Sequence, residues 1–541
     1  HYHLPEKLLD ITLITLVGIL LCTLTWRWFA GREKPRKFKL ELILIPLVFS
    51  LTILLDINLI LHLKEPARET FPASQWKNSI AVLPFVDMSP QKDQEYFCDG
   101  MTEELINRLS NIRELRVPAR TSVFAFKGKA EDIREIGRKL NVEKVLEGSI
   151  RKEDSQLRIT VQLVNVSDSY HIWSETFDKE LTKVFAIQDE IALTVADKLK
   201  LTLLSDEKAR LVKRPTENLE AYNLCLLGRY FLYRAFTEED FNKAIGYLEQ
   251  AIAKDPGYSL AYALLAECYT VCYSIGYLAP KEVYPKAMEA AKKAIELDDE
   301  LGEAHASLGY LKWVFDWDSS GAEHEFKRAL KLNPGSVDVY FFYSQYLATL
   351  GRFEEAIAGL KRVIELDPAS PANYILLGMY GYQVAGRYDY DESIAQIKKG
   401  LDMDPSILYG QLFLASAYAL KGMYSEAVAQ ADKVLSAWPT GEDVLIFSCL
   451  GWVYAVSGQQ EKARSLLNRM LDLRARRYVD AYVIGAVYAG LGEKDKAFEW
   501  LNKAYEEHAG QMIFIKVDPW IKNLHSDPRY KELLKKIGFE K

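Results

Sequence analysis

The stretch "LGRFEEAIAGLKRVIELDP", residues 350–368, decides the fold because its pattern occurs again along the chain. Residues 421–439, "KGMYSEAVAQADKVLSAWP", have the same order of features: a glycine, an aromatic residue two positions later, apolar residues at helical spacing and a closing proline. A proline disfavours helical geometry in the residue before it, so each stretch predicts an amphipathic helix that ends just ahead of its proline.

The spacing of these helix ends predicts a repeat. From about residue 218 they recur at intervals of 43, 35, 34, 37 and 34 residues, at Pro256, Asp299, Pro334, Pro368, Pro405 and Pro439. A period of 34 residues is typical of the tetratricopeptide repeat, a pair of antiparallel helices. One such pair cannot bury its own apolar face, so neighbouring pairs stack into a superhelix. We therefore expect about eight repeats over residues 218–509, forming a right-handed α-solenoid, and a capping segment over residues 510–541.

A solenoid of this kind indicates binding. Its concave face is an extended surface that accepts a protein or peptide segment, and its repeats have no pocket built for chemistry. Tyrosines on the predicted first helices are the candidate partner-binding residues: Tyr340, Tyr343, Tyr409 and Tyr482. Packing between repeats is the more frequent role of such tyrosines, and both interpretations are open at this point.

Two apolar segments precede the repeats. Residues 8–26 contain Asp10 as their only charge, and residues 40–63 are long enough to span a bilayer but carry Glu41 and Asp56. We expect both to be transmembrane helices within a membrane segment, residues 1–66, that a linker at 67–78 follows. A carboxylate is costly in lipid, so Asp56 lies near the membrane surface or meets a membrane partner.

The loop between these two segments sets the expected topology. Residues 27–39 hold six lysines and arginines against one acidic residue, and positive loops stay in the cytoplasm. The expected localisation is therefore a bacterial inner membrane, with contacts to the lipid bilayer through the N-terminal helices and the remaining domains on the periplasmic side.

Residues 79–203 predict a compact α/β domain. "SIAVLPF" (79–85) is a short apolar run typical of a buried strand, and "SQLRITVQLVNV" (155–166) alternates as half-buried antiparallel strands do. Between them, helical spacing follows "YFCDGMTEELINRLS", where Thr102, Glu103 and Glu104 are suited to a helix's first turn. A long amphipathic helix closes the domain, and residues 204–217 then form a linker.

The same residues carry a family resemblance. "SIAVLPF…YFCDGMTEELINRLS…LRVPARTSVFAFKGK…DIREIGRKLNVEKVLEGSIRK…YHIWSETFDKEL" resembles the TolB-like amino-terminal domain, which occurs in many bacterial membrane proteins just before tetratricopeptide repeats. The resemblance implies an α/β fold but supplies no catalytic residues. It also implies frequent fusion behind a nucleotide cyclase, a protein kinase or a DNA-binding domain, none of which is visible in this chain.

The chemistry-bearing residues predict no active site. A net charge of −7 argues against a nucleic-acid partner, which would require a basic face. We find no phosphate-binding loop, dinucleotide fingerprint, zinc motif or nucleophile elbow, so we expect no enzyme, no cofactor and no metal. Arg120 and Lys127 flank "TSVFAFKG" and could bind an anion, although solvated surface is their more frequent role. His324, in "EHEF", has no second ligand nearby.

The expected fold class is α/β plus all-α: N-terminal transmembrane helices, a TolB-like domain and a tetratricopeptide solenoid. The expected function is a membrane-anchored, non-catalytic scaffold that binds a protein partner on the concave face. The alternative is the regulatory half of a signalling protein, whose output module precedes His1 or belongs to another chain.

Overall fold

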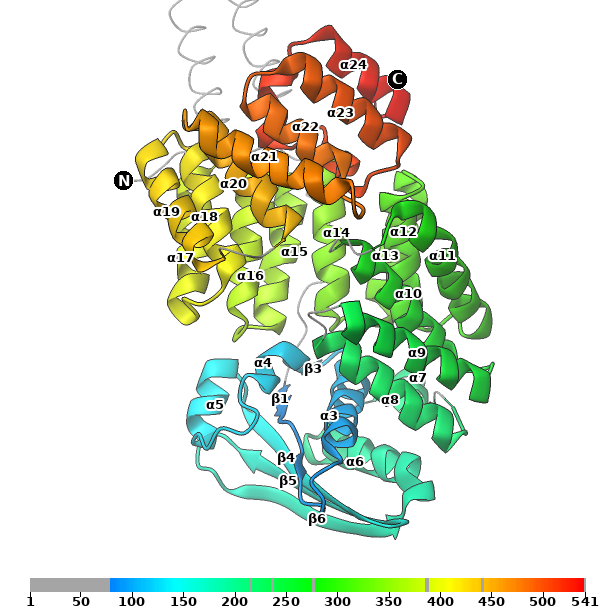
Figure 1. Ribbon diagram of the computed structural model, residues 1–541. Coiled ribbons are helices and arrows are strands. Elements are labelled where there is room, and N and C mark those ends of the chain that lie inside the picture. The colour runs from blue at the N-terminus through cyan, green and yellow to red at the C-terminus, as the bar shows by residue number, and fades with distance from the viewer. Residues whose placement is uncertain are drawn as a thin grey trace, which may run out of the picture. The chain divides into compact units, whose positions relative to one another are not determined.

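The computed structural model describes residues 78–539, except 202, 212, 215, 235–237, 275–277, 385–388 and 439–441. Its first part is the predicted α/β domain (Figure 1). The strands of this domain are β1 (Asn78–Val82), β2 (Val86–Asp87), β3 (Leu115–Arg116), β4 (Lys144–Glu153), β5 (Gln156–Asn165) and β6 (His171–Glu180). Its helices are α3 (Glu95–Ser110), α4 (Arg120–Phe124), α5 (Ile133–Leu140), η2 (Leu181–Lys183) and α6 (Val184–Lys198).

The strands form one mixed sheet in the order β3-β1-β4-β5-β6, with β2 paired to β4 beside this path. β1 runs parallel to β3 and β4, whereas β4, β5 and β6 form an antiparallel meander. The alternation read from residues 155–166 is confirmed, because Leu157, Ile159, Val161 and Leu163 of β5 are fully buried. Their polar neighbours occupy the opposite face, so only one side of the sheet carries the core.

The rest of the described chain is helical. A short helix, α7 (Ser205–Leu211), leads into eight helix hairpins. The first helices of the hairpins are α8 (Leu219–Arg234), α10 (Ser259–Ser274), α12 (Gly302–Val314), α14 (Val337–Thr349), α16 (Pro371–Leu376) with η3 (Leu377–Val384), α18 (Leu408–Leu420), α20 (Val444–Val456) and α22 (Ala481–Gly490). The second helices are α9 (Glu238–Lys254), α11 (Pro280–Leu297), α13 (Ser319–Leu332), α15 (Phe353–Leu366), α17 (Tyr390–Met403), α19 (Tyr424–Ala437), α21 (Gln460–Arg474) and α23 (Lys494–Glu506). The chain ends with η4 (Gly510–Phe514), η5 (Pro519–Leu524) and α24 (Pro528–Ile537).

The small residues of the repeat pattern allow the helices of a hairpin to approach closely. A Cβ atom on Gly228 of α8 would lie 2.6 Å from Leu248 of α9, closer than two carbon atoms can approach. Gly351, Gly422, Gly458 and Gly492 instead occupy the turns within hairpins, each with φ between 77° and 82°, the left-handed region that glycine adopts without strain.

First helices of successive hairpins also contact each other, as α10 contacts α12 and α20 contacts α22. They form a continuous layer, which we call the inner layer.

The predicted fold class is corrected in one respect. No helix among the described residues is long and apolar enough to cross a membrane. Even the longest of them, α11 with 18 residues, carries lysines and glutamates along its length. The spans predicted at 8–26 and 40–63, with Asp56, lie outside the described residues.

The fold of the described residues is therefore a small α/β domain followed by helical repeats, without the transmembrane helices that the predicted fold class included. The expected localisation in a bacterial inner membrane depended on those helices and is withdrawn with them.

Candidate interaction surface

The four candidate tyrosines all lie on the inner layer, but they differ in how far their side chains are exposed. Tyr340 and Tyr343 of α14 are fully buried. Tyr482 of α22 is 3% exposed, and its hydroxyl donates a hydrogen bond of 2.7 Å to Asp518. Tyr409 of α18 is 44% exposed and donates to Asp443 at 2.7 Å. Of the four tyrosines, only Tyr409 offers a partner an exposed side chain in this conformation.

A set of partly exposed aromatic rings lies elsewhere on the inner layer and on η4. Tyr310 of α12 meets Phe342 of α14 with ring centroids 5.1 Å apart, and Phe341 meets Tyr380 of η3 at 5.8 Å. Phe514 of η4 lies 5.9 Å from Tyr380. We call these five residues the aromatic strip. The available sequence signal was the place of four of these residues on predicted first helices. Sequence alone did not show that Phe342 is partly exposed while its neighbour Tyr343 is buried.

Carboxylates lie on three successive first helices, two of which also carry rings of the aromatic strip. Glu267 of α10 and Glu303 of α12 are partly exposed, and Asp338 of α14 is exposed. Restricted hydration, and then the nearby charge of Asp338, raise the pKa of Glu267 to about 8. Restricted hydration also raises the pKa of Glu303. Because ionising these carboxylates together costs free energy, a further cation among them would be favoured, although the nearby Arg229 already opposes the rise in both pKa values.

The C-terminal segment 510–524 packs against the inner layer as well. Trp520 of η5 stacks on Trp452 of α20, with centroids 5.3 Å apart, and its indole N–H donates to Ser416 Oγ at 3.1 Å. Asn523 Nδ2 donates to the Ala489 carbonyl at 2.7 Å. Part of the predicted capping segment therefore lies across several first helices rather than only on the last repeat.

The α/β domain meets the repeats through the end of the stretch quoted first. Asp367, the aspartate of "ELDP", is 1% exposed. Its carboxylate accepts hydrogen bonds from Thr121 and Ser122 of α4 and, at 2.8 Å, from Asn373 Nδ2. Burial raises the pKa of Asp367, and these donors oppose the rise. Nearby, the Arg116 guanidinium donates to the Glu365 carbonyl at 3.0 Å.

A second contact joins α3, α4 and α8. Glu103 of α3 is 5% exposed; it pairs with Arg120 of α4 and lies 3.7 Å from the buried Arg229 of α8. Lys127 pairs with Asp99 of α3 at 2.5 Å. Arg120 and Lys127, which were candidates for anion binding, thus have carboxylate partners from the same domain. Leu226 of α8 belongs to the α/β core, so that core extends into the first repeat.

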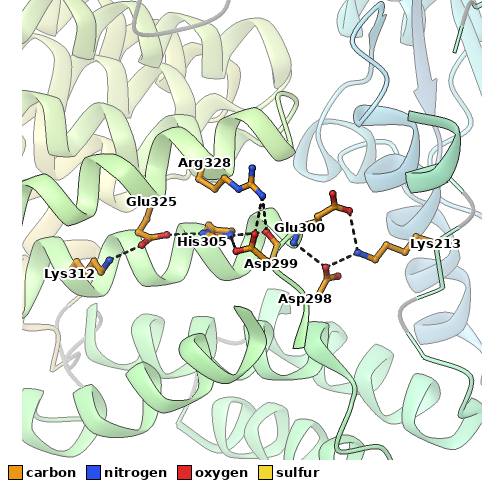
Figure 2. Close-up of polar contacts among 8 residues, drawn as sticks. All are labelled: Lys213, Asp298, Asp299, Glu300, His305, Lys312, Glu325 and Arg328. Atoms are coloured by element: carbon orange, nitrogen blue, oxygen red, sulfur yellow. Dashed lines mark hydrogen bonds and ion pairs between the residues drawn. The ribbon is translucent and has the colours of Figure 1, made fainter. Parts of the chain in front are cut away.

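A polar network fixes the hairpin of α12 and α13 (Figure 2). The His305 Nδ1 atom lies 2.7 Å from Glu325, and Nε2 lies 3.0 Å from the Asp299 carbonyl. Lys312 donates to the other Glu325 oxygen at 2.7 Å, and Arg328 reaches Asp299. These ion pairs and hydrogen bonds lower the pKa of Glu325 to about 2 although burial opposes the change. Beside the network, Lys213 pairs with Asp298 at 2.7 Å (Figure 2).

The described residues contain no group of three or more histidine, cysteine or carboxylate side chains that could hold a metal ion. Five cysteines of the described chain are buried and form no disulfide bonds with one another: Cys98, Cys225, Cys268, Cys272 and Cys449. The structure places rings of the aromatic strip and partly exposed carboxylates on successive first helices.

Comparisons with known proteins also distinguish an α/β domain from a region of helical repeats. The model of the "HilA/YgeH-like transcriptional regulator, second domain" matches residues 76–194, where the sequence resembles a TolB-like domain; the TolB-like assignment itself is not shown. Tetratricopeptide repeat models match residues 235–271, 318–371 and 386–442.

Two curated relatives match about half of the chain. "Putative adenylate cyclase 3" of Rhizobium meliloti is 35% identical over 260 residues, 48% of this chain and 44% of the relative. The transcriptional regulator HilA of Salmonella typhimurium is 24% identical over 314 residues, 58% of this chain and 53% of the relative. The chain therefore spans only about half the length of these relatives.

Two solved structures resemble the fold more distantly. The human IFIT1 dimer with m7Gppp-AAAA has a TM-score of 0.40 at 15% identity, and it covers 59% of this chain and 76% of its own. The type IV pilus biogenesis factor PilW has a TM-score of 0.35 at 19% identity, with 43% and 99% covered. Together with the family models, the hairpins and their spacing identify the C-terminal part of this chain as an array of tetratricopeptide repeats.

Proposed function

We propose that this chain is a non-catalytic binding module whose inner layer accepts a protein segment bearing basic and apolar side chains. The observation that supports the proposal most directly is that successive first helices carry both rings of the aromatic strip and the carboxylates Glu267 and Glu303. Aromatic rings contribute large apolar contact area, and carboxylates whose ionisation is opposed gain when a lysine or arginine approaches. Tyr409 and its neighbours extend this surface toward the later repeats.

The test is a selection from a library of random short peptides on the immobilised full chain. We expect enrichment of peptides that combine lysine or arginine with apolar residues. The E267Q/E303Q variant keeps side-chain size but cannot ionise when a lysine or arginine approaches, so it should lose the preference for basic residues. Glu289→Gln, on the exposed side of the second helix α11, is the matched control and should keep it. Enrichment of acidic peptides, or equal preferences in both variants, would contradict the proposal.

A second candidate function is the regulatory half of a signalling protein. It is supported by the names of the relatives, an adenylate cyclase and a transcriptional regulator, and by the fact that this chain corresponds to only about half of each. In this proposal the α/β domain, which resembles both the TolB-like and HilA-like domains, transmits partner binding to an output module on another chain or outside the given sequence. Co-purification of a cyclase or DNA-binding protein that depends on Glu267 and Glu303 would favour this candidate over a scaffold.

A further inference from the structure

The sheet of the α/β domain ends in an edge strand, β6, whose outer edge is unpaired among the described residues. β6 is the last strand of the sheet order and pairs with β5 on one side only (Figure 1). Eight of its ten residues are exposed. Within the described part of the chain, no strand pairs with its outer edge. Such an edge presents a row of backbone donors and acceptors and is a template for a further strand.

β6 lacks several features that block strand addition. Its sequence, HIWSETFDKE, contains neither proline nor glycine, and the register shift in its pairing lies at the end near His171. Charged side chains on an edge can also prevent pairing, because like charges on facing strands repel. Whether Glu175, Asp178, Lys179 and Glu180 block a partner depends on which residues would face each other.

We propose that β6 pairs antiparallel with β6 of a second copy of this chain, so that the two sheets join into one across a two-fold axis at Phe177. In an antiparallel ladder, facing residues direct their backbone groups either both toward or both away from the partner strand. When a strand pairs with its own copy, the two-fold axis must therefore pass beside one residue, and that residue faces the same residue of the copy. This condition leaves few registers, and the charges distinguish among them.

The register centred on Phe177 is the only one in which Lys179 faces a carboxylate. It places Glu175 opposite Lys179 twice, once on each side of the axis. A register centred on Glu175 or on Asp178 would place that carboxylate opposite its own copy. A register centred on Thr176 would place Glu175 opposite Phe177. Because opposite charges on facing strands attract and like charges repel, the Phe177 register is favoured.

The side chains that would meet in this register lie on one face of the sheet. Phe177 faces Ile159 within the core, so Glu175 and Lys179, two positions away on either side, lie on that same face. Both are exposed, and Glu175 also accepts a hydrogen bond of 3.1 Å from the Trp173 indole. The partner that we infer is a second copy, because an identical antiparallel strand supplies a lysine opposite Glu175 and a glutamate opposite Lys179 at the required spacing.

The test measures self-association of the full 541-residue chain by sedimentation equilibrium over a range of concentrations. We expect a monomer–dimer equilibrium. Lys179→Glu makes both facing pairs repulsive and should weaken dimerisation about tenfold or more, since each facing pair changes sign. The charge-exchanged variant E175K/K179E restores two attractive pairs and should restore the dimer.

The matched control is Lys198→Glu, an identical charge change at an exposed position near the end of α6, which should leave the equilibrium unchanged. Circular dichroism of each variant checks the fold. A chain that stays monomeric at all concentrations would overturn the proposal. So would a dimer that Lys179→Glu and Lys198→Glu affect equally, or one that E175K/K179E fails to restore.

Discussion

Asp367 shows how one residue joins the two parts of the described chain. Its carboxylate is buried and accepts hydrogen bonds from Thr121, Ser122 and Asn373. Asp367→Ala would leave three donors without an acceptor, so the free energy of unfolding should fall by about 2–4 kcal/mol. Asp404→Ala is the matched control: Asp404 also precedes a proline at a repeat end, but its carboxylate contacts only Ser406. Chemical denaturation of both variants checks the difference, and equal losses would contradict this role of Asp367.

The sequence predicted the position of Asp367 but not its partners. "ELDP" indicates a helix end, and α15 does end at Leu366. Thr121 and Ser122, however, lie about 245 residues earlier, and no local pattern links them to one repeat end rather than another. The same limit applies to the tyrosines, because spacing placed Tyr343 and Tyr409 alike on first helices while only tertiary packing decides which ring is exposed.

His305 is a second single residue with a testable effect, because its ionisation makes the stability of the protein depend on pH. Burial disfavours its charged form, but hydrogen bonds to Glu325 and to the Asp299 carbonyl outweigh burial, and the pKa of His305 is raised. A histidine whose pKa is higher in the folded state stabilises the protein below its unfolded pKa, and this stabilisation is lost as pH rises through the folded pKa.

The stability advantage of the wild type over His305→Gln should therefore shrink as the pH rises above about 6.5 and through the raised pKa of His305. Denaturation at several pH values measures it. His324→Gln, at an exposed position on the adjoining helix α13, controls for loss of a histidine. If the stability advantage of the wild type instead grows with pH, the pKa of His305 is not raised in the folded state and the prediction is wrong.

At the scale of elements, the hairpin of α8 and α9 contains two glycines with opposite roles. A Cβ on Gly228 would collide with Leu248 and would also lie 3.3 Å from the Ala244 carbonyl, so Gly228→Ala should destabilise the protein by about 1–3 kcal/mol. Gly246 lies within α9 with no atom near its would-be Cβ. Gly246→Ala should stabilise by about 0.5–1 kcal/mol, because alanine favours helix. Thermal unfolding of the two variants should shift in opposite directions; a shift in the same direction would contradict the packing argument.

The sequence predicted which segments are helical more reliably than it predicted where each helix begins and ends. Thr102, Glu103 and Glu104 have the composition of a first turn, yet α3 begins at Glu95 and these residues lie inside it. The earlier start is stabilised by Asp87, whose carboxylate accepts from the Gln94 amide at 2.9 Å, and by burial of Phe97 and Cys98 in the core. Thr102 instead accepts a hydrogen bond from the Phe85 amide at 3.0 Å. Tertiary contacts therefore overrode the local end signal.

At the scale of the whole described molecule, the α/β domain and the first repeat share one hydrophobic core. Tyr222 and Leu226 of α8 belong to the same core as the strands β1, β4 and β5. A Cβ on Gly100 of α3 would lie 2.6 Å from Leu226, which shows how closely α3 and α8 approach. The predicted boundary at 204–217 thus separates two sequence patterns, while the packing continues across it. A regulatory role would use this continuity, because binding on the repeats and the state of the α/β domain would then be coupled.

Leu226→Ala should reveal this coupling. Removing a leucine from a buried site costs about 3 kcal/mol, and because the core is shared, amide hydrogen exchange should accelerate both in α8 and α9 and in β4 and β5. Leu466→Ala in α21 is the matched control: both leucines are 3% exposed, but Leu466 belongs to the core of the later repeats. It should accelerate exchange in α20 to α23 and leave β4 and β5 protected. If Leu226→Ala accelerates exchange in the helices alone, the α/β domain and the repeats open independently, and binding on the inner layer would have no route through this contact to the sheet.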